Sequence, residues 1–211
     1  MTGALLPQQP TDQVPTVFVV DDEEAMRNAL RRALVQSGLA VQAFASGREF
    51  LDHYRPVPAA CLLLDMKMPE MTGLELQAIL VERRIDLPVI FLTGAADVPA
   101  AVQAMKAGAR DFLEKPIANE VLVARIRQCM ASQTAPVHTG NDDRFERGQA
   151  QLTPREAEVM QLMLTGKTSK VIARALGVSH RTIDIHRGRV MDKMGAETLA
   201  DLVRMELSRR P

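Results

Sequence analysis

The sequence has few cysteines, no long apolar run and no net charge, and each shortage excludes a class of protein. Its two cysteines, Cys61 and Cys129, have no metal-ligand spacing, and Cys61 lies in an apolar run. We expect both to be buried as small hydrophobic side chains in a reducing cytoplasm. No apolar run approaches the roughly 18 residues of a membrane span, and the first residues lack the pattern of an export signal. These absences predict a cytoplasmic protein with no membrane partner.

The zero net charge conceals an asymmetry along the chain. Residues 1–130 carry 13 basic and 16 acidic side chains, residues 131–150 carry 2 and 3, and residues 151–211 carry 11 and 7. A basic C-terminal segment mildly indicates nucleic-acid binding, although a solvated helix surface often has the same composition.

Short apolar runs alternate with helical patterns from Thr16 to about residue 130. The runs are residues 16–20, 40–44, 61–64, 88–92 and 111–114, and the clearest helical period extends from Met26 to Leu34. Alternation of this kind is typical of a parallel sheet with helices on both faces. The sequence therefore predicts an α/β domain at 16–131 with a five-stranded, doubly wound parallel sheet.

The remaining residues follow different patterns. Residues 132–150 are polar and aperiodic, which predicts a linker or, for part of it, an extension of the preceding helix. From residue 151 strand patterns are absent, and four helical segments broken by glycine predict a small all-α domain at 151–211. Its first helix begins with Thr153 as the N-cap, Pro154 at the first position and Glu156 completing a capping box.

Polar side chains follow four of the apolar runs. Asp21 and Asp22 follow the first run, Asp65 the third, Thr93 the fourth and Lys115 the fifth. The carboxyl ends of parallel strands meet at one edge of a sheet, where ligands bind. Three converging carboxylates favour Mg²⁺. Asp65 would then be the nucleophile that forms an aspartyl-phosphate, with Thr93 and Lys115 stabilising the phosphoryl oxygens.

One class of enzyme also begins its reaction with attack by an aspartate on a phosphoryl group. Phosphatases of the haloacid-dehalogenase type also use an Asp nucleophile after an apolar run, and they need a second Asp two residues later as a general acid. Lys67 stands at that position here, and its ammonium cannot do that work at neutral pH. We therefore expect phosphorylation of the protein itself, and no enzyme that turns over a free substrate.

Three segments together resemble the receiver domain of two-component response regulators, in particular the FixJ-like branch: VVDDE (19–23), LLLDMKMPEMTGLEL (62–76) and FLTGAADVPAAVQAMKAGARDFLEKP (91–116). The resemblance implies that Asp65 accepts a phosphoryl group from a sensor histidine kinase. It implies that Asp21, Asp22, Asp65 and the backbone carbonyl of Lys67 hold Mg²⁺. A cis peptide bond at Lys115–Pro116 is also implied.

The resemblance further implies a switch. Thr93 moves toward the phosphoryl group and Phe112 turns inward, although Phe112 is also explained as an ordinary core residue. The segments 97–108 and 110–114 would form the responsive face, through which the phosphorylated protein forms a homodimer. We expect the charged residues of this face to be exposed to solvent: Asp97, Lys106, Arg110 and Asp111.

Residues 152–203 resemble the LuxR-type helix-turn-helix output domain, which binds double-stranded promoter DNA. In the third helix of this domain, Ile183, Val190 and Met194 form one apolar stripe that should face the core. The opposite side, which can enter the major groove, carries Arg181, Asp184, Ile185, Gly188 and Asp192.

Two kinds of DNA contact are expected. By position in the motif, Asp184, Ile185 and Gly188 would read bases, with Arg181 beside them on the outward side. Contacts to phosphates are expected from a set of polar and basic residues, namely Lys170, Thr182, Arg187, Arg189 and Lys193. The whole chain is thus predicted to be a phosphorylation-dependent transcriptional regulator. The alternatives are a receiver that acts as a phosphate sink and a protein-interaction module without DNA output.

Overall fold

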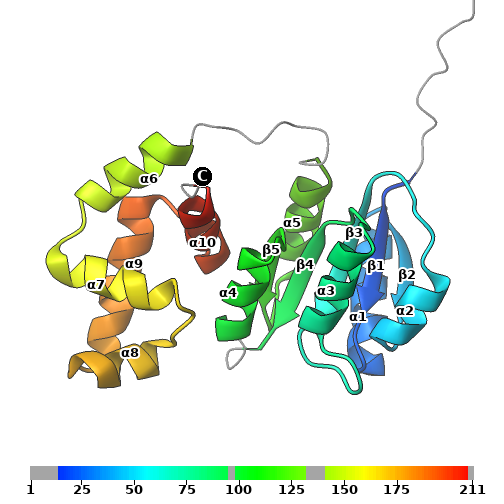
Figure 1. The fold of residues 1–211 in the computed structure, drawn as a ribbon, viewed down its shortest axis with the longest axis horizontal. Coiled ribbons are helices and arrows are strands. Elements are labelled where there is room, and N and C mark those ends of the chain that lie inside the picture. The colour runs from blue at the N-terminus through cyan, green and yellow to red at the C-terminus, as the bar shows by residue number, and fades with distance from the viewer. Residues whose placement is uncertain (1–13, 95–97, 132–140, 209–211) are drawn as a thin grey trace, which may run out of the picture.

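The computed structural model describes residues 14–94, 98–131 and 141–208. Figure 1 shows an α/β domain followed by a helical domain that lies against one edge of the sheet. The first domain contains five strands, β1 (Thr16–Val20), β2 (Ala40–Phe44), β3 (Ala60–Asp65), β4 (Val89–Thr93) and β5 (Asp111–Glu114). Their bounds differ by at most one residue from the apolar runs of the sequence.

The strands form one parallel sheet in the order β2-β1-β3-β4-β5. Five helices cover it: α1 (Glu24–Gln36), α2 (Gly47–His53), α3 (Gly73–Glu82), α4 (Val98–Lys106) and α5 (Asn119–Ala131). Alternate side chains of β1 enter two separate cores, because Phe18 packs with Phe50 of α2 and Val17 with Leu34 of α1. The predicted doubly wound sheet is therefore confirmed.

The helical domain consists of α6 (Asn141–Ala150), α7 (Pro154–Met163), α8 (Ser169–Leu176), α9 (His180–Met194) and α10 (Leu199–Leu207). The predicted capping box at Thr153 and Glu156 begins α7. Gly177 and Gly195 end α8 and α9 in the left-handed conformation, which a residue without a Cβ adopts at least cost.

Helix α6 corrects the linker prediction for residues 141–150. The aromatic side chain of Phe145 is completely buried, and a Cβ on Gly148 would lie 3.0 Å from the carbonyl oxygen of Lys193 on α9. One buried ring and a close helix contact hold this polar segment in place. The predicted linker residues 132–140 lie outside the described residues.

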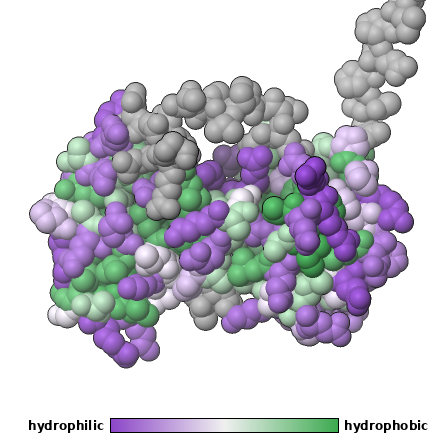
Figure 2. Space-filling model, in the orientation of Figure 1, coloured by the Kyte–Doolittle hydropathy of each residue, from purple (hydrophilic) through white to green (hydrophobic). Residues whose placement is uncertain are grey.

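The residues on the surface of the α/β domain are of mixed hydropathy, as expected when the two apolar cores lie inside it. Figure 2 shows hydrophilic and apolar residues interspersed over the α/β domain, with an apolar group over α7 and α8 of the helical domain. Within the described ranges, no helix combines the length and apolar character needed to cross a membrane.

Candidate functional site

Two of the three predicted carboxylates, Asp21 and Asp65, meet at the carboxyl edge of the sheet around one ammonium. Lys115 Nζ donates to Asp65 Oδ1 at 2.5 Å and to Asp21 Oδ2 at 3.1 Å. Asp21 is 1% exposed and Asp65 9% exposed. Residues from the ends of β1, β3 and β5 thus form one charged cluster, as the sequence predicts. The Lys115–Pro116 peptide bond is cis, which confirms that expectation.

Asp65 is positioned from both sides. Its Oδ2 accepts a hydrogen bond from the backbone amide of Lys67 at 2.8 Å. Behind it lies Gly73, at the start of α3, where any Cβ would collide with the backbone carbonyl oxygen of Asp65. Gly73 is not among the residues predicted to form the site, although the glycine in LLLDMKMPEMTGLEL is the signal that could have indicated this close approach.

Asp21 is fixed by its own loop. Its Oδ1 accepts from the backbone amide of Glu23 at 2.9 Å, and Arg27 Nη1 donates to the backbone carbonyl of Asp21 at 2.8 Å. The neighbouring carboxylate, Asp22, is exposed to solvent. The cluster around Lys115 therefore has two carboxylates, both buried, and no contact joins Asp22 to it among the described residues.

Opposing effects set the proton affinity of the cluster. Burial raises the pKa of Asp65, and the nearby charge of Asp21 raises it further, while the hydrogen bond and charge of Lys115 lower it. Burial lowers the pKa of Lys115, but its bonds to Asp65 and Asp21 outweigh that effect and the net pKa is raised. The lysine is therefore a permanent cation beside a carboxylate that remains costly to ionise.

The donor set fits a hard divalent cation. The oxygens of Asp21 and Asp65 contact the same ammonium, so they already lie close enough to share one cation. Across the described residues, no three His, Cys, Asp or Glu side chains converge as a complete metal site. Mg²⁺ commonly uses one or two carboxylates and completes its shell with water and phosphate oxygens, so this donor set suits Mg²⁺.

The two predicted switch residues lie on adjacent strands. Thr93 is fully buried at the end of β4, and its hydroxyl donates to the backbone carbonyl of Gly94 at 3.2 Å. Phe112 of β5 is 6% exposed and belongs to the core on the α4 side of the sheet. It also lines a cleft between the two domains. Neighbouring strands thus connect the edge of the sheet that carries the charged cluster to the domain boundary.

Helix α9 has the two sides that the sequence predicts. Ile183, Val190 and Met194 are buried in the domain core. The opposite side is exposed, and consists of Arg181, Asp184, Ile185, Gly188 and Asp192. Ile185 is 50% exposed, and a Cβ on Gly188 would meet no atom within 4 Å. The protein itself therefore gives no packing reason for an apolar side chain or a glycine at these positions.

The predicted phosphate contacts divide into free and engaged side chains. Lys170 and Arg189 are exposed, whereas Thr182 is part-buried and its hydroxyl shares a hydrogen bond of 2.7 Å with the N-cap hydroxyl of Ser179. Lys193 donates to the buried carboxylate of Glu156 at 2.6 Å, which joins α9 to α7. The bond from Lys193, together with the hydrogen bonds from Thr153, lowers the pKa of Glu156 to about 2. Lys193 thus has a structural role that the sequence analysis did not anticipate.

An ion-pair cluster joins the two domains. Arg125 of α5 donates two hydrogen bonds, both 3.1 Å long, to the carboxylate of Asp201 on α10. Arg204 of α10 lies 3.3 Å from Asp111 of β5, and Arg125 lies 3.9 Å from the same carboxylate.

Asp111 is only 5% exposed, so its predicted solvent exposure was wrong. Lys106 and Arg110 are exposed as expected, and Asp97 lies outside the described residues.

The helical domain contacts the predicted responsive face. Helix α10 packs against α4 and β5 (Figure 1). Gly166, between α7 and α8, lies so close to Pro99 of α4 that a Cβ there would collide with the proline backbone. Gly166 also has a φ of 78°, so two constraints favour glycine at this contact.

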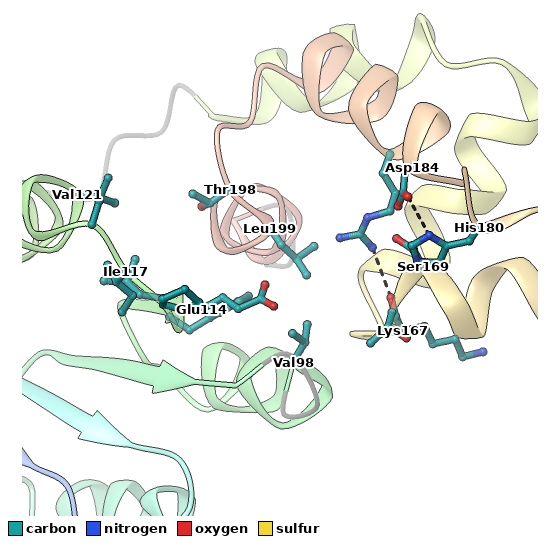
Figure 3. Close-up of a pocket in the computed structure, with 16 residues that line it drawn as sticks. Val98, Glu114, Ile117, Val121, Lys167, Ser169, His180, Asp184, Thr198 and Leu199 are labelled. Atoms are coloured by element: carbon teal, nitrogen blue, oxygen red, sulfur yellow. Dashed lines mark hydrogen bonds and ion pairs between the residues drawn. The ribbon is translucent and has the colours of Figure 1, made fainter. Parts of the chain in front are cut away.

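A cleft of about 670 Å³ separates β5 from the helix-turn-helix. In Figure 3, Glu114 extends from the α/β side toward a wall that contains Lys167, His180 and Asp184. Arg187 lines the same cleft, and burial lowers its pKa although the charges of Asp184 and Glu114 oppose that shift. Two predicted DNA contacts, Asp184 and Arg187, therefore face the α/β domain.

Comparisons with known proteins agree with both halves of the molecule. Residues 17–127 match the response regulator receiver domain, and residues 150–206 match the bacterial regulatory proteins of the luxR family. The chain is 42% identical over 193 residues to the transcriptional regulatory protein FixJ of Azorhizobium caulinodans, covering 90% of this chain and 91% of that protein. It is 42% identical over 201 residues to the C4-dicarboxylate transport transcriptional regulatory protein DctR of Rhodobacter capsulatus, covering 90% and 98%.

Solved structures of response regulators also resemble this chain. Full-length FixJ from B. japonicum has a TM-score of 0.54 and 36% sequence identity, covering 92% of this chain and 96% of that chain. The structure of FixJ-N has a TM-score of 0.53 and 41% identity, covering 60% and 99%. The scores are nearly equal although the second match lacks a counterpart of the helical domain. The α/β domain therefore accounts for most of the structural agreement.

Proposed function

Since the chain belongs to the two-component response regulators that join a receiver domain to a LuxR-type DNA-binding domain, we propose that phosphorylation of Asp65 controls its binding to promoter DNA. The observation that carries the proposal is the cluster of Lys115, Asp21 and Asp65 at the edge of a sheet whose β5 contacts the helical domain. The phosphoryl donor is a sensor histidine kinase, as the family implies.

The residues of the cluster have separate tasks in the transfer. Asp65 is the nucleophile, and the amide of Lys67 orients its second oxygen. Lys115 neutralises the incoming phosphoryl oxygens, and Thr93 reorients its hydroxyl from Gly94 to donate to them. Asp21, Asp22, Asp65 and the carbonyl of Lys67 would hold Mg²⁺, which when bound neutralises further phosphate charge.

The domain contact explains how phosphorylation reaches the DNA-binding surface. The helical domain covers α4 and β5, the face through which we expect phosphorylated receivers to dimerise. One surface cannot hold both partners, so dimerisation requires the helical domain to leave. Departure also frees Asp184 and Arg187 from the cleft. A two-state change from 1:99 to 99:1 needs about 5.5 kcal/mol of differential binding, which several charge-assisted contacts to a phosphoryl group can supply.

The first test measures phosphorylation directly. Full-length protein treated with acetyl phosphate and Mg²⁺ should gain about 80 Da, the mass of one phosphoryl group. The Asp65→Asn variant should gain nothing, and Glu82→Gln, which changes an exposed carboxylate outside the cluster, should still be modified. An adduct that survives Asp65→Asn would overturn the assignment.

The second test measures the output. Genome-wide mapping of binding sites should recover promoters for wild type and fewer for Asp65→Asn. Gel shifts on the recovered sites with random competitor DNA should show a steep loss of affinity with salt, because phosphate contacts release counterions. Absence of DNA binding in either phosphorylation state would instead favour a receiver that acts as a phosphate sink.

A further inference from the structure

The two cysteines of the sequence, 68 positions apart, lie side by side in the structure. Cys61 on β3 and Cys129 on α5 have their sulfur atoms 3.8 Å apart, with the thiol of Cys61 directed at the sulfur of Cys129. Both belong to the core between the sheet and helices α1 and α5. The sequence correctly predicts that both are buried, but it places no constraint on the distance between them.

The two thiols differ in their surroundings. Cys61 is completely enclosed, whereas Cys129 lines a cavity of about 80 Å³ at the domain boundary. Arg110 of the receiver domain and Arg204 of α10 line the same cavity. A cavity of this size admits a molecule as small as water or hydrogen peroxide.

The same arrangement makes Cys129 the more nucleophilic sulfur. The hydrogen bond from Cys61 lowers the pKa of Cys129, and the charges of Arg110 and Arg204 lower it further, against the effects of burial and of the Asp111 charge. The pKa of Cys61 is raised by donating that bond and by burial. The thiolate is the reactive form of cysteine, so attack on an oxidant begins at Cys129.

We propose that Cys61 and Cys129 form a reversible disulfide when the protein meets hydrogen peroxide, and that this disulfide loosens the contact between the two domains. The proposal goes beyond phosphorylation, because none of its residues belongs to the Asp65 cluster. Transient disulfides in cytosolic proteins are commonly redox-sensing.

The chemistry proceeds in two balanced steps. The Cys129 thiolate attacks one oxygen of hydrogen peroxide, the O–O bond breaks, and hydroxide leaves to take up the proton that Cys129 had released. Cys129 is then a sulfenic acid. The sulfur of Cys61 attacks it, the S–O bond breaks, and the proton of Cys61 leaves with the hydroxyl as water. Two thiols and one peroxide thus give one disulfide and two waters.

The link to the domain contact lies in α5. A disulfide bond is about 2.05 Å long, so the sulfurs must approach by about 1.8 Å from their 3.8 Å separation. Cys129 lies one helical turn after Arg125, on the same side of α5. Arg125 holds Asp201 of α10 through two hydrogen bonds. Drawing this turn of α5 toward β3 therefore displaces the arginine that anchors the helical domain.

Oxidation is tested on the full-length protein, both wild type and Asp65→Asn. Reduced protein denatured in N-ethylmaleimide should carry two adducts. After peroxide it should carry none, and peptide mapping should join the segments that contain Cys61 and Cys129. Dithiothreitol should restore both thiols. Thiols that stay reactive after peroxide, sulfinic acid as the main product, or a disulfide between two molecules would overturn the proposal.

Single variants test the order of attack. In Cys61→Ala, a dimedone probe should trap a sulfenic acid at Cys129, whereas Cys129→Ala should leave Cys61 unlabelled. The reverse pattern would overturn the assignment of Cys129 as the attacking thiol. Because both variants remove a buried side chain, the wild-type cross-link remains the primary test if one of them fails to fold.

Hydrogen exchange tests the coupling to the domain boundary. Amides of α10 should exchange faster in oxidised than in reduced wild type. Arg125→Gln should show fast exchange in both states, because its anchor is already lost. Formation of the disulfide without any change in α10 exchange would overturn the proposed coupling. Failure of phosphorylation would leave these outcomes unaffected, since Asp65→Asn must give the same result.

Discussion

At the scale of single residues, the proposed phosphorylation site brings like charges together at a cost in free energy. Asp65 and Asp21 are buried carboxylates that share one ammonium, and the charge of one raises the pKa of the other. A fold selected for stability alone would not place two carboxylates here. In the proposed function, the excess of carboxylate charge attracts the divalent cation that neutralises the phosphoryl oxygens.

The replacement Asp65→Asn should therefore stabilise the protein. Burial raises the pKa of Asp65 above its ordinary value of 3.8, so its ionisation disfavours the folded state at neutral pH. We expect the free energy of unfolding at pH 7 to rise by roughly 1 kcal/mol, as at other functional sites relieved of strain. Urea unfolding of both proteins measures the difference.

The pH dependence provides the control for that prediction. The gain should shrink as the pH falls through the raised pKa, and it should vanish below 3.8, where Asp65 is protonated in both folded and unfolded chains. Asp22→Asn removes an exposed carboxylate and should show no such gain. An Asp65→Asn protein less stable than wild type at pH 7 would contradict the explanation.

At the scale of elements, α9 carries a glycine for which the protein offers no internal reason. A glycine within a helix costs about 1 kcal/mol relative to alanine, and Gly188 faces open space. Gly188→Ala should raise the free energy of unfolding by that amount. It should also lower affinity for the promoters recovered by mapping, because the added methyl group prevents close approach of the helix backbone to DNA.

Thermal unfolding and gel shifts on one sample separate the two effects. Gly148→Ala makes the same change on α6, where the new Cβ would lie 3.0 Å from α9, so it should lose stability while Gly188→Ala gains it. Unchanged DNA affinity in Gly188→Ala would show that the glycine is merely tolerated.

The elements differ in how far the sequence determines them. Strands β1, β2 and β5 occupy the predicted residues. Their positions were predictable because a short apolar run between turn residues is typical of a buried strand. Helix α6 was missed because its sequence, NDDRFERGQA, is polar, and among its side chains whose burial is described only that of Phe145 is enclosed completely. Its stability depends on α9, which no local pattern reveals.

Some side-chain contacts could also be predicted from the sequence, and others could not. The cluster of Asp21, Asp65 and Lys115 was predictable because parallel strands bring their carboxyl ends together. The bond between Arg125 and Asp201 joins residues 76 positions apart in different domains. No periodicity or motif indicates which charged residues of two domains will meet, so this cluster required the structure.

At the scale of the whole molecule, Arg125 holds the two domains together. Its two charge-assisted hydrogen bonds to Asp201 contribute about 1.5–3 kcal/mol, and about 1.4 kcal/mol corresponds to a tenfold change in an equilibrium. Arg125→Gln should therefore raise the DNA affinity of the unphosphorylated protein about tenfold. Fluorescence anisotropy on a recovered promoter site measures it.

A neighbouring arginine provides the matched control. Arg127, on the same helix, donates to the backbone carbonyl of Ser37 within the receiver domain. Arg127→Gln removes the same charge without touching α10, so it should leave DNA affinity near the wild-type value. Equal effects of the two variants would indicate a general change in charge and not release of the helical domain.

The ion pair between Asp21 and Lys115 has a consequence for the life of the chain in the cell. The two residues lie 94 positions apart, at the first and the last strand of the receiver. While a ribosome is still extending the chain, or after a protease has cut it before β5, the carboxylates stand without their cation. A chain that ends before β5 therefore lacks the cation that the proposed function needs beside Asp65, and the cluster is complete only when the whole receiver has been made.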